Sequence, residues 1–253
     1  MYIDIEKTKK EFSSFTEKYV RQCPVVASKV SHSFRVMEIS NLIAKKMNLN
    51  EEDIEIATLI GLLHDIARFE QYTKYGTYSD VDSIDHGDYG VEILNKDIRK
   101  YVDTDKYDTL IKTAIKNHNK FEIEPGLNER ELFFCKLIRD ADKVDILYEA
   151  TYMFWDGIED QENNSELNKK VYECFCKYKT IKRVKGENYE DFNKVITTSA
   201  FVFDINFEET FEIIYKEDYI NRILDRFNYK HSEIQENVRT ISNNYIKNKV
   251  GIN

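Results

Sequence analysis

The sequence has few of the residues that break or cross-link a chain, with only two prolines, eight glycines and four cysteines among 253 residues. Few hairpin turns can be formed from so little proline and glycine, and apolar residues recur at helical spacing, so we expect a mostly helical chain. Cys23 and Cys135 stand alone, while Cys174 and Cys176 are separated by one residue instead of the two of a redox or zinc pair. We therefore expect four reduced thiols.

Long apolar runs are also missing. The first twenty residues mix charged side chains among single apolar ones, so they lack the apolar core of a signal peptide. No later stretch approaches the length of a membrane span. These absences predict a cytoplasmic protein that has no membrane partner.

Positive charge is the smaller part of the charge balance, with 37 basic against 46 acidic residues and a net charge of −9. This balance opposes a broad attraction to a nucleic acid backbone or to anionic lipid. The expected partner is a small molecule and not a nucleic acid polymer, and the sequence leaves open whether the chain forms homo-oligomers.

The helical pattern predicts one all-α domain over residues 1–253. Asn50 followed by three acidic residues predicts a helix start, from which the helix runs toward His64. The segment 70–85 is predicted to be a loop. No linker rich in proline or glycine separates the halves, so we expect a core at about 25–150 and a helical extension at about 151–253. Further helices are predicted at about 3–20, 29–47, 86–100, 106–119, 129–154, 164–178, 188–201 and 207–228.

Four of the five histidines fall before position 120, next to carboxylates. His32 and His118 each continue an apolar helical stripe, so both are expected to point inward. His64 and the adjacent Asp65 lie about 100° apart around a helix, where both side chains can reach one ion. His86 is expected near a helix start, and its orientation cannot be inferred from the sequence.

Any one of these histidines alone is better explained as an ordinary core or surface residue. Four of them with a His-Asp doublet favour a shared metal centre, because isolated buried imidazoles would each need a separate hydrogen-bond partner. Imidazole together with carboxylate suits iron, manganese, cobalt, nickel or zinc, whereas magnesium or calcium would favour oxygen ligands alone.

These residues resemble the HD superfamily, whose pattern is a histidine, a His-Asp doublet and a distal aspartate on separate helices. The matching parts are His32, the run LLHDIAR at 62–68 and the run RDADKVD at 139–145. The resemblance covers at least residues 25–150, and the run FVFDINF at 201–207 also resembles the tail of bacterial members. It implies an HD-type helical bundle with a C-terminal helical extension, in which five helices converge on the metal.

By this resemblance the chain is a metal-dependent phosphohydrolase that uses a metal-activated hydroxide. Asp140 and Asp142 are about 200° apart on a helix and cannot both face one ion, and Asp142 is chosen because the family's ligand precedes a basic and then a hydrophobic residue. Two divalent ions are implied, with Asp65 bridging them and contributing to catalysis. The implied metal ligands are His32, His64, Asp65, His86, His118 and Asp142.

Two basic residues have implied roles at this centre. In similar enzymes the lysine that follows the distal aspartate contacts substrate phosphate, so Lys143 is expected to do so here. Arg68, one turn after His64, is a second candidate for catalysis. The alternative for each is a salt bridge to a ligand carboxylate.

The expected substrate is a phosphomonoester, phosphodiester or phosphoanhydride, such as a nucleotide or another small phosphorylated metabolite. The Gly-Tyr-Pro signature of cyclic di-GMP phosphodiesterases is absent, which disfavours that substrate. Two alternatives remain open. Similar six-ligand centres with two irons serve as oxygenases of small molecules, and a catalytically silent, metal-binding regulatory module would have the same fold.

Overall fold

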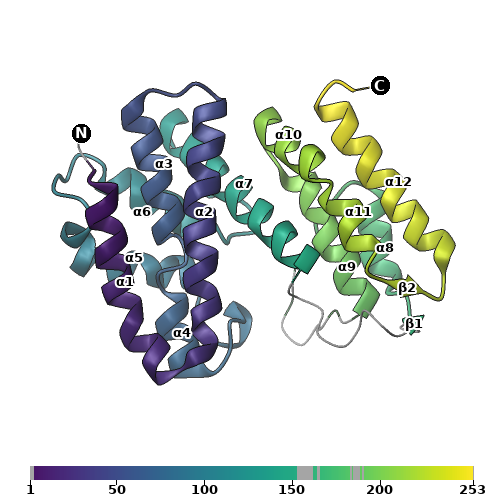
Figure 1. The fold of residues 1–253 in the computed structure, drawn as a ribbon, viewed down its shortest axis with the longest axis horizontal. Helices are drawn as coiled ribbons and strands as arrows, with labels where there is room; N and C mark the ends of the chain where they lie inside the picture. Colours follow the sequence, from purple (N-terminus) through teal and green to yellow (C-terminus); the bar gives the residue numbers. More distant parts are fainter. Residues whose placement is uncertain are drawn as a thin grey trace. The chain divides into compact units, whose positions relative to one another are not determined.

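The computed structural model describes residues 3–152, 162–163, 166–182, 184, 189 and 191–252. These residues form α-helices, short 3-10 helices and one pair of two-residue strands (Figure 1). The predicted all-α fold class is therefore confirmed. Among the described helices, none combines the length and the apolar character that crossing a bilayer requires.

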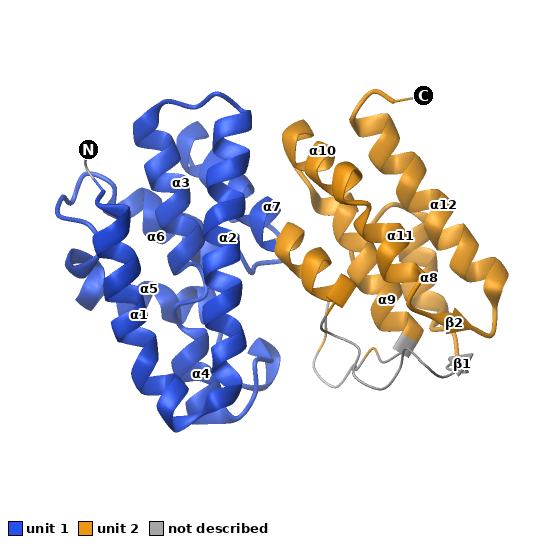
Figure 2. Ribbon diagram, in the orientation of Figure 1, with its two compact units in different colours: residues 1–142 blue, residues 143–253 orange. Residues whose placement is uncertain are grey.

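The chain divides into two compact units, residues 1–142 and 143–253, which Figure 2 shows in different colours. The boundary falls inside helix α7, between Asp142 and Lys143. The division into units rests on contacts and does not concern independent folding. The single domain over 1–253, with a core at about 25–150, therefore stays a prediction.

Unit 1 contains the segments in which all six predicted metal ligands lie. Its 3-10 helices are η1 (Pro24–Val26), η2 (Asp80–Asp82) and η3 (Ile98–Lys100). Its α-helices are α1 (Ile5–Gln22), α2 (Ala27–Lys46), α3 (Glu51–Leu63), α4 (Arg68–Tyr75), α5 (His86–Asp97), α6 (Asp108–Asn117) and the first part of α7 (Glu129–Tyr152).

Side-chain caps begin four of these helices, among them α7, where Asn128 accepts a hydrogen bond from the backbone N–H of Glu131. Asn50 accepts a hydrogen bond from the backbone N–H of Asp53 at the start of α3, as the sequence predicts. Asp4 caps α1 and Asp85 caps α5 in the same way. Each cap satisfies a backbone N–H that has no partner inside the helix. The cap at Asp85 matters most for the site, because it fixes the start of α5 at His86.

Helices α2 and α3 lie side by side and form the centre of unit 1 (Figure 1). Every residue of α3 from Ile56 to Leu63 is buried, which explains its nearly continuous apolar sequence. The helices approach closely at Gly61, where an added Cβ would lie 2.7 Å from Ser40 Oγ and 2.9 Å from Met37 Cα. The missing side chain at Gly61 therefore makes room for α2.

Three sequence predictions about helices were wrong. The predicted loop at 70–85 contains most of α4, whose C-terminus is closed by the left-handed Gly76. The single helix predicted at 207–228 is two helices, because Asp218 adopts a left-handed conformation between them. The helix α12 (Ser232–Lys249) was not predicted at all. Residues 153–154, 164–165, 188 and 190 of three predicted helices lie outside the described part of the chain.

Unit 2 is also helical. The strands β1 (Glu162–Asn163) and β2 (Asn228–Tyr229) pair in parallel within it. Its remaining elements are the end of α7, α8 (Lys169–Cys176), α9 (Asp191–Ser199), the 3-10 helix η4 (Ala200–Asp204), α10 (Glu208–Glu217), α11 (Tyr219–Leu224) and α12.

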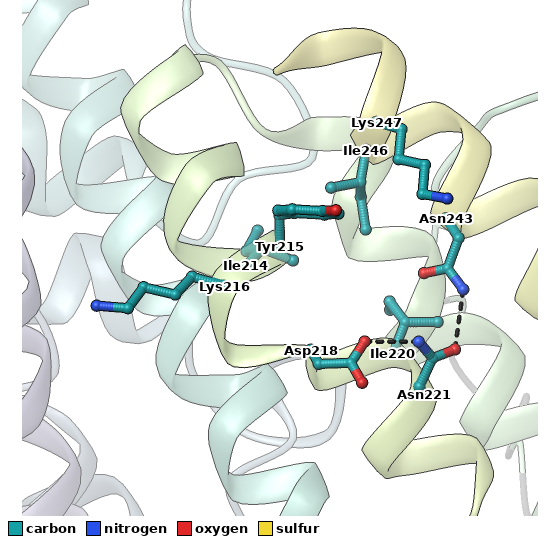
Figure 3. A pocket seen from close by; sticks show the side chains of 9 residues that line it. All are labelled: Ile214, Tyr215, Lys216, Asp218, Ile220, Asn221, Asn243, Ile246 and Lys247. Atoms are coloured by element: carbon teal, nitrogen blue, oxygen red, sulfur yellow. Dashed lines mark hydrogen bonds between the residues drawn. The ribbon is translucent and has the colours of Figure 1, made fainter. Parts of the chain in front are cut away.

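A pocket of about 380 Å³ lies among α10, α11 and α12 (Figure 3). On one of its sides Asn221 donates a hydrogen bond to Asp218 and accepts one from Asn243. None of the six predicted metal ligands lines this pocket. The chemistry predicted from the sequence therefore belongs to a different part of the molecule.

The close approach at Gly61 predicts that Gly61→Ala destabilises the protein. The new Cβ would press on Ser40, Met37 and the carbonyl oxygen of Val36, and two of these contacts involve backbone atoms that cannot move freely. Overpacking of this kind costs about 1–3 kcal/mol. We expect chemical denaturation to show a free energy of unfolding lowered by that amount.

Gly90→Ala is the matched control. Its Cβ would meet a methyl group of Ile115 at 3.2 Å, a contact that a side chain can relieve, and alanine favours the helix. Equal stability of the Gly61→Ala and Gly90→Ala proteins would contradict the close approach of α2 and α3.

Candidate metal centre

The six predicted ligands come together in unit 1, and three of the four histidines lie at helix ends. His32 lies within α2, and Asp142 lies within α7. His64 and His118 directly follow the last residues of α3 and α6, and His86 is the first residue of α5. The exposed fraction of each histidine is 4% or less, while the side chain of Asp142 is 20% exposed.

His32, His64 and Asp142 form the first half of the centre. The two Nε2 atoms of the histidines are 3.2 Å apart. Asp142 Oδ1 lies 3.2 Å from Nε2 of His32 and 3.6 Å from Nε2 of His64. Asp65 Oδ2 lies 3.4 Å and 3.6 Å from the same two nitrogens. Each of the two carboxylate oxygens therefore lies within 3.6 Å of both histidine nitrogens.

His86 and His118 form the second half. Their Nε2 atoms are 2.9 Å apart. The other oxygen of Asp65, Oδ1, lies 3.3 Å from Nε2 of His86 and 3.6 Å from Nε2 of His118. The carboxylate of Asp65 therefore turns one oxygen to each pair of histidines, which is the arrangement of a bridging ligand.

The donor atoms fit bound metal ions. Ligand atoms about 2.1 Å from a tetrahedral ion are about 3.4 Å from one another, and the separations here run from 2.9 to 3.6 Å. Nδ1 of His64 and Nδ1 of His118 point at the carbonyl oxygens of Gly61 and Ile115, at 2.8 and 2.6 Å. These bonds put the proton on Nδ1 and leave the Nε2 lone pairs for an ion, as metal-bound histidines require.

The electrostatics of the centre favour the protonation states that bind metal. Burial lowers the pKa of His118 to about 4, so its ring is neutral at neutral pH. Burial alone would raise the pKa of the Asp65 carboxyl, but Lys29, His64 and Arg68 together outweigh it and hold this pKa well below its usual range. Asp65 is therefore ionised.

Lys29 is a residue of the centre that the sequence reasoning missed. Its Nζ lies 2.9 Å from Asp65 Oδ2, and its side chain is 21% exposed. Lys29 stands three residues before His32 on α2, so helical spacing from a predicted ligand would have indicated it.

Arg68 contacts Asp65 with one nitrogen and three other residues with another. Its Nε lies 3.3 Å from Asp65 Oδ1, while Nη1 donates to Asp80, to Gln71 and to the carbonyl oxygen of Tyr78. These contacts favour the salt bridge that the sequence left open for Arg68. Its catalytic role stays a prediction.

Lys143 belongs to unit 2, where its Nζ lies 2.9 Å from Asp204 Oδ2. Asp204 ends η4 and is part of the FVFDINF run that the sequence singled out. The contact of Lys143 with substrate phosphate therefore also stays a prediction.

Residues 30–147 match the family model described as HD domain. The matched segment contains all six predicted ligands, from His32 to Asp142. HD domains form a superfamily of metal-dependent hydrolases that bind divalent ions. No curated protein and no solved structure matches the chain.

The geometry separates the two aspartates of α7 in a way that can be tested. Asp142 belongs to a group that can hold an ion, whereas Asp140 belongs to none of the groups found among the described residues. We expect Asp142→Asn to lose most of its bound metal, because an amide is a much poorer ligand than a carboxylate for a transition metal. Asp140→Asn, the matched control, should keep its metal and a substantial fraction of activity.

Elemental analysis of both purified variants measures the difference, with circular dichroism to check the fold. If Asp140→Asn loses its metal and Asp142→Asn keeps it, the ligand is Asp140.

Proposed function

We propose, from the premise that residues 30–147 form an HD domain, that this protein is a metal-dependent phosphohydrolase. Its substrate would be a nucleotide or another small phosphorylated metabolite. The observation that carries the proposal is the divided carboxylate of Asp65, which offers one oxygen to each pair of histidines. Two-ion sites of this kind are used for displacement at phosphorus.

In this proposal each half of the centre holds one divalent transition metal ion. Asp142 with His32 and His64 would hold the first ion, His86 with His118 the second, and Asp65 both. When bound, such a pair of ions lowers the pKa of a water molecule and polarises the phosphoryl oxygen. No nucleophilic side chain is then required.

The charges around the centre support an anionic substrate. Among the charged side chains of unit 1 described above, the carboxylates of Asp65, Asp142 and Asp80 outnumber the cations of Lys29 and Arg68 by one. Two ions of charge +2 would turn this small negative excess into a positive one, which attracts phosphate.

The exposed fractions support a direction of approach for the substrate. The histidine rings are almost fully buried, whereas Lys29 and Asp142 keep about a fifth of their side chains exposed. Lys29 would therefore be among the first cations that an incoming phosphate meets. Its ammonium can offset negative charge that develops on the phosphoryl group.

A panel of phosphorylated metabolites tests the proposed reaction. The protein is supplied with manganese, iron, cobalt or nickel, and release of phosphate and of nucleotide is measured. We expect hydrolysis of at least one class, and a loss of about 100-fold or more in His64→Ala, because this change removes a ligand of the first ion.

Parallel assays without oxygen separate the two enzyme classes. A hydrolase turns over its substrate equally well with and without oxygen. Product formation that needs oxygen and consumes it would favour the oxygenase instead, and a protein that binds metal without turning over any substrate would favour the regulatory module.

His118→Ala tests the number of ions. The change removes a ligand of the second ion alone, so the stoichiometry should fall from about two ions to about one per chain. Activity should fall steeply, and circular dichroism should show that the fold persists. A wild-type protein that never exceeds one ion per chain, even with excess iron or manganese, would contradict the two-ion centre.

A further inference from the structure

Asp80 is a carboxylate behind the metal centre that no sequence motif indicated. It begins η2, between α4 and α5, within the segment that was predicted to be a loop. Its oxygen Oδ2 accepts hydrogen bonds from Nδ1 of His86 at 2.6 Å and from Nδ2 of Asn119 at 2.9 Å. Its oxygen Oδ1 accepts from Nε2 of Gln71 at 2.9 Å and from Nη1 of Arg68 at 3.1 Å.

This contact makes His86 different from two other predicted ligands. Nδ1 of His64 and Nδ1 of His118 face backbone carbonyl oxygens, whereas Nδ1 of His86 faces a charged carboxylate. A carboxylate acceptor draws the Nδ1 proton more strongly than a carbonyl does, and this makes the opposite nitrogen a more basic ligand. Nε2 of His86 is the atom that faces His118 and Asp65.

The second half of the centre has greater need of a strong ligand than the first. Asp142, His32, His64 and Asp65 supply four ligand atoms to the first half. His86, His118 and Asp65 supply three to the second half. A position with fewer protein ligands holds its ion less tightly unless each ligand is well oriented and basic.

Asp80 also closes a ring of polar contacts. Asp65 Oδ1 contacts Arg68, Arg68 contacts Asp80, Asp80 contacts His86, and His86 returns to Asp65 Oδ1. Oδ1 of Asp65 therefore contacts both Arg68 and His86, the two residues that connect it to Asp80. Every side chain that contacts Asp80 directly can donate a hydrogen bond, so only an acceptor with two oxygens satisfies the position.

We propose that Asp80 is a positioning residue that sets how tightly the ion site of His86, His118 and Asp65 holds its metal. It orients the His86 ring through Nδ1 and strengthens Nε2 as a ligand. This inference rests on the two-ion centre of the proposed function, but it concerns metal affinity and not the reaction.

Asp80→Asn tests the inference in the full-length protein. The amide replaces one acceptor oxygen with an NH₂ group, which faces donors instead of acceptors. The metal-free protein is titrated with manganese, and the two dissociation constants are measured by calorimetry and by equilibrium dialysis with elemental analysis. We expect the weaker dissociation constant to rise about 10–100-fold, and the tighter one to change by less than about threefold.

Asp82→Asn is the matched control. Asp82 lies two residues further along η2, is exposed, and accepts a hydrogen bond only from Ser79 among the contacts given for its side chain. The substitution makes the same change of charge at nearly the same place. Both dissociation constants should therefore stay within about twofold of the wild-type values.

Gln71→Met separates the effect on His86 from a general loosening of the segment. Gln71 is fully buried, and its Nε2 also donates to Ser83 Oγ and to the carbonyl oxygen of Ile84, both at 2.9 Å. Methionine keeps the shape and removes these bonds, so the melting temperature should fall while the second ion remains bound.

Three results would overturn the proposal in different ways. An unchanged dissociation constant for the second ion in Asp80→Asn would overturn the proposal for Asp80 and leave the two-ion centre in place. Equal loss of the second ion in Gln71→Met would mean that Asp80 acts through loop rigidity and not through His86. A wild-type protein that takes only one ion would overturn it together with the two-ion centre, whereas a missing hydrolase activity would leave the affinity result to stand.

Discussion

The sharing of the Asp65 carboxylate between two pairs of histidines is the interaction on which the arrangement of unit 1 depends. Four imidazole rings lie buried in the interior of unit 1, where lone pairs directed at one another repel. A carboxylate with an oxygen on each side, held ionised by Lys29 and Arg68, makes that interior suitable for cations. The helix ends at His64, His86 and His118 serve this geometry, because each turns a ring nitrogen toward the same carboxylate.

Gly61 contributes to the centre twice. Its missing side chain lets α2 approach α3, and its carbonyl oxygen accepts the Nδ1 proton of His64. The spacing of the two helices and the orientation of a ligand ring are therefore determined at one residue. A change there would alter packing and metal binding together, whereas the pocket of unit 2 is lined by other helices.

Local patterns were sufficient to predict much of this structure. Apolar stripes gave the inward direction of His32 and His118, and the Asn50 cap gave the start of α3, since both depend only on residues one or two turns away. Contacts and turns outside regular helices left no such pattern. Asp80 lies in the short 3-10 helix η2 when it contacts His86 and Asn119, and helical spacing alone does not reveal the left-handed conformation of Asp218 that divides α10 from α11. The helix α12 was missed although Ile234, Val238 and Ile241 stand at helical spacing, so the pattern that predicts the other helices is present there too.

Because the predicted ligands are far apart along the chain, a bound metal ion would couple the folding of distant segments of unit 1. His32 stands near the beginning of that unit and Asp142 is its last residue, so one ion held between them binds only when the whole unit is folded. Binding that is confined to the folded state adds stability in proportion to the logarithm of the free metal concentration. The resistance of unit 1 to heat and proteolysis would therefore rise with the concentration of free metal around the protein.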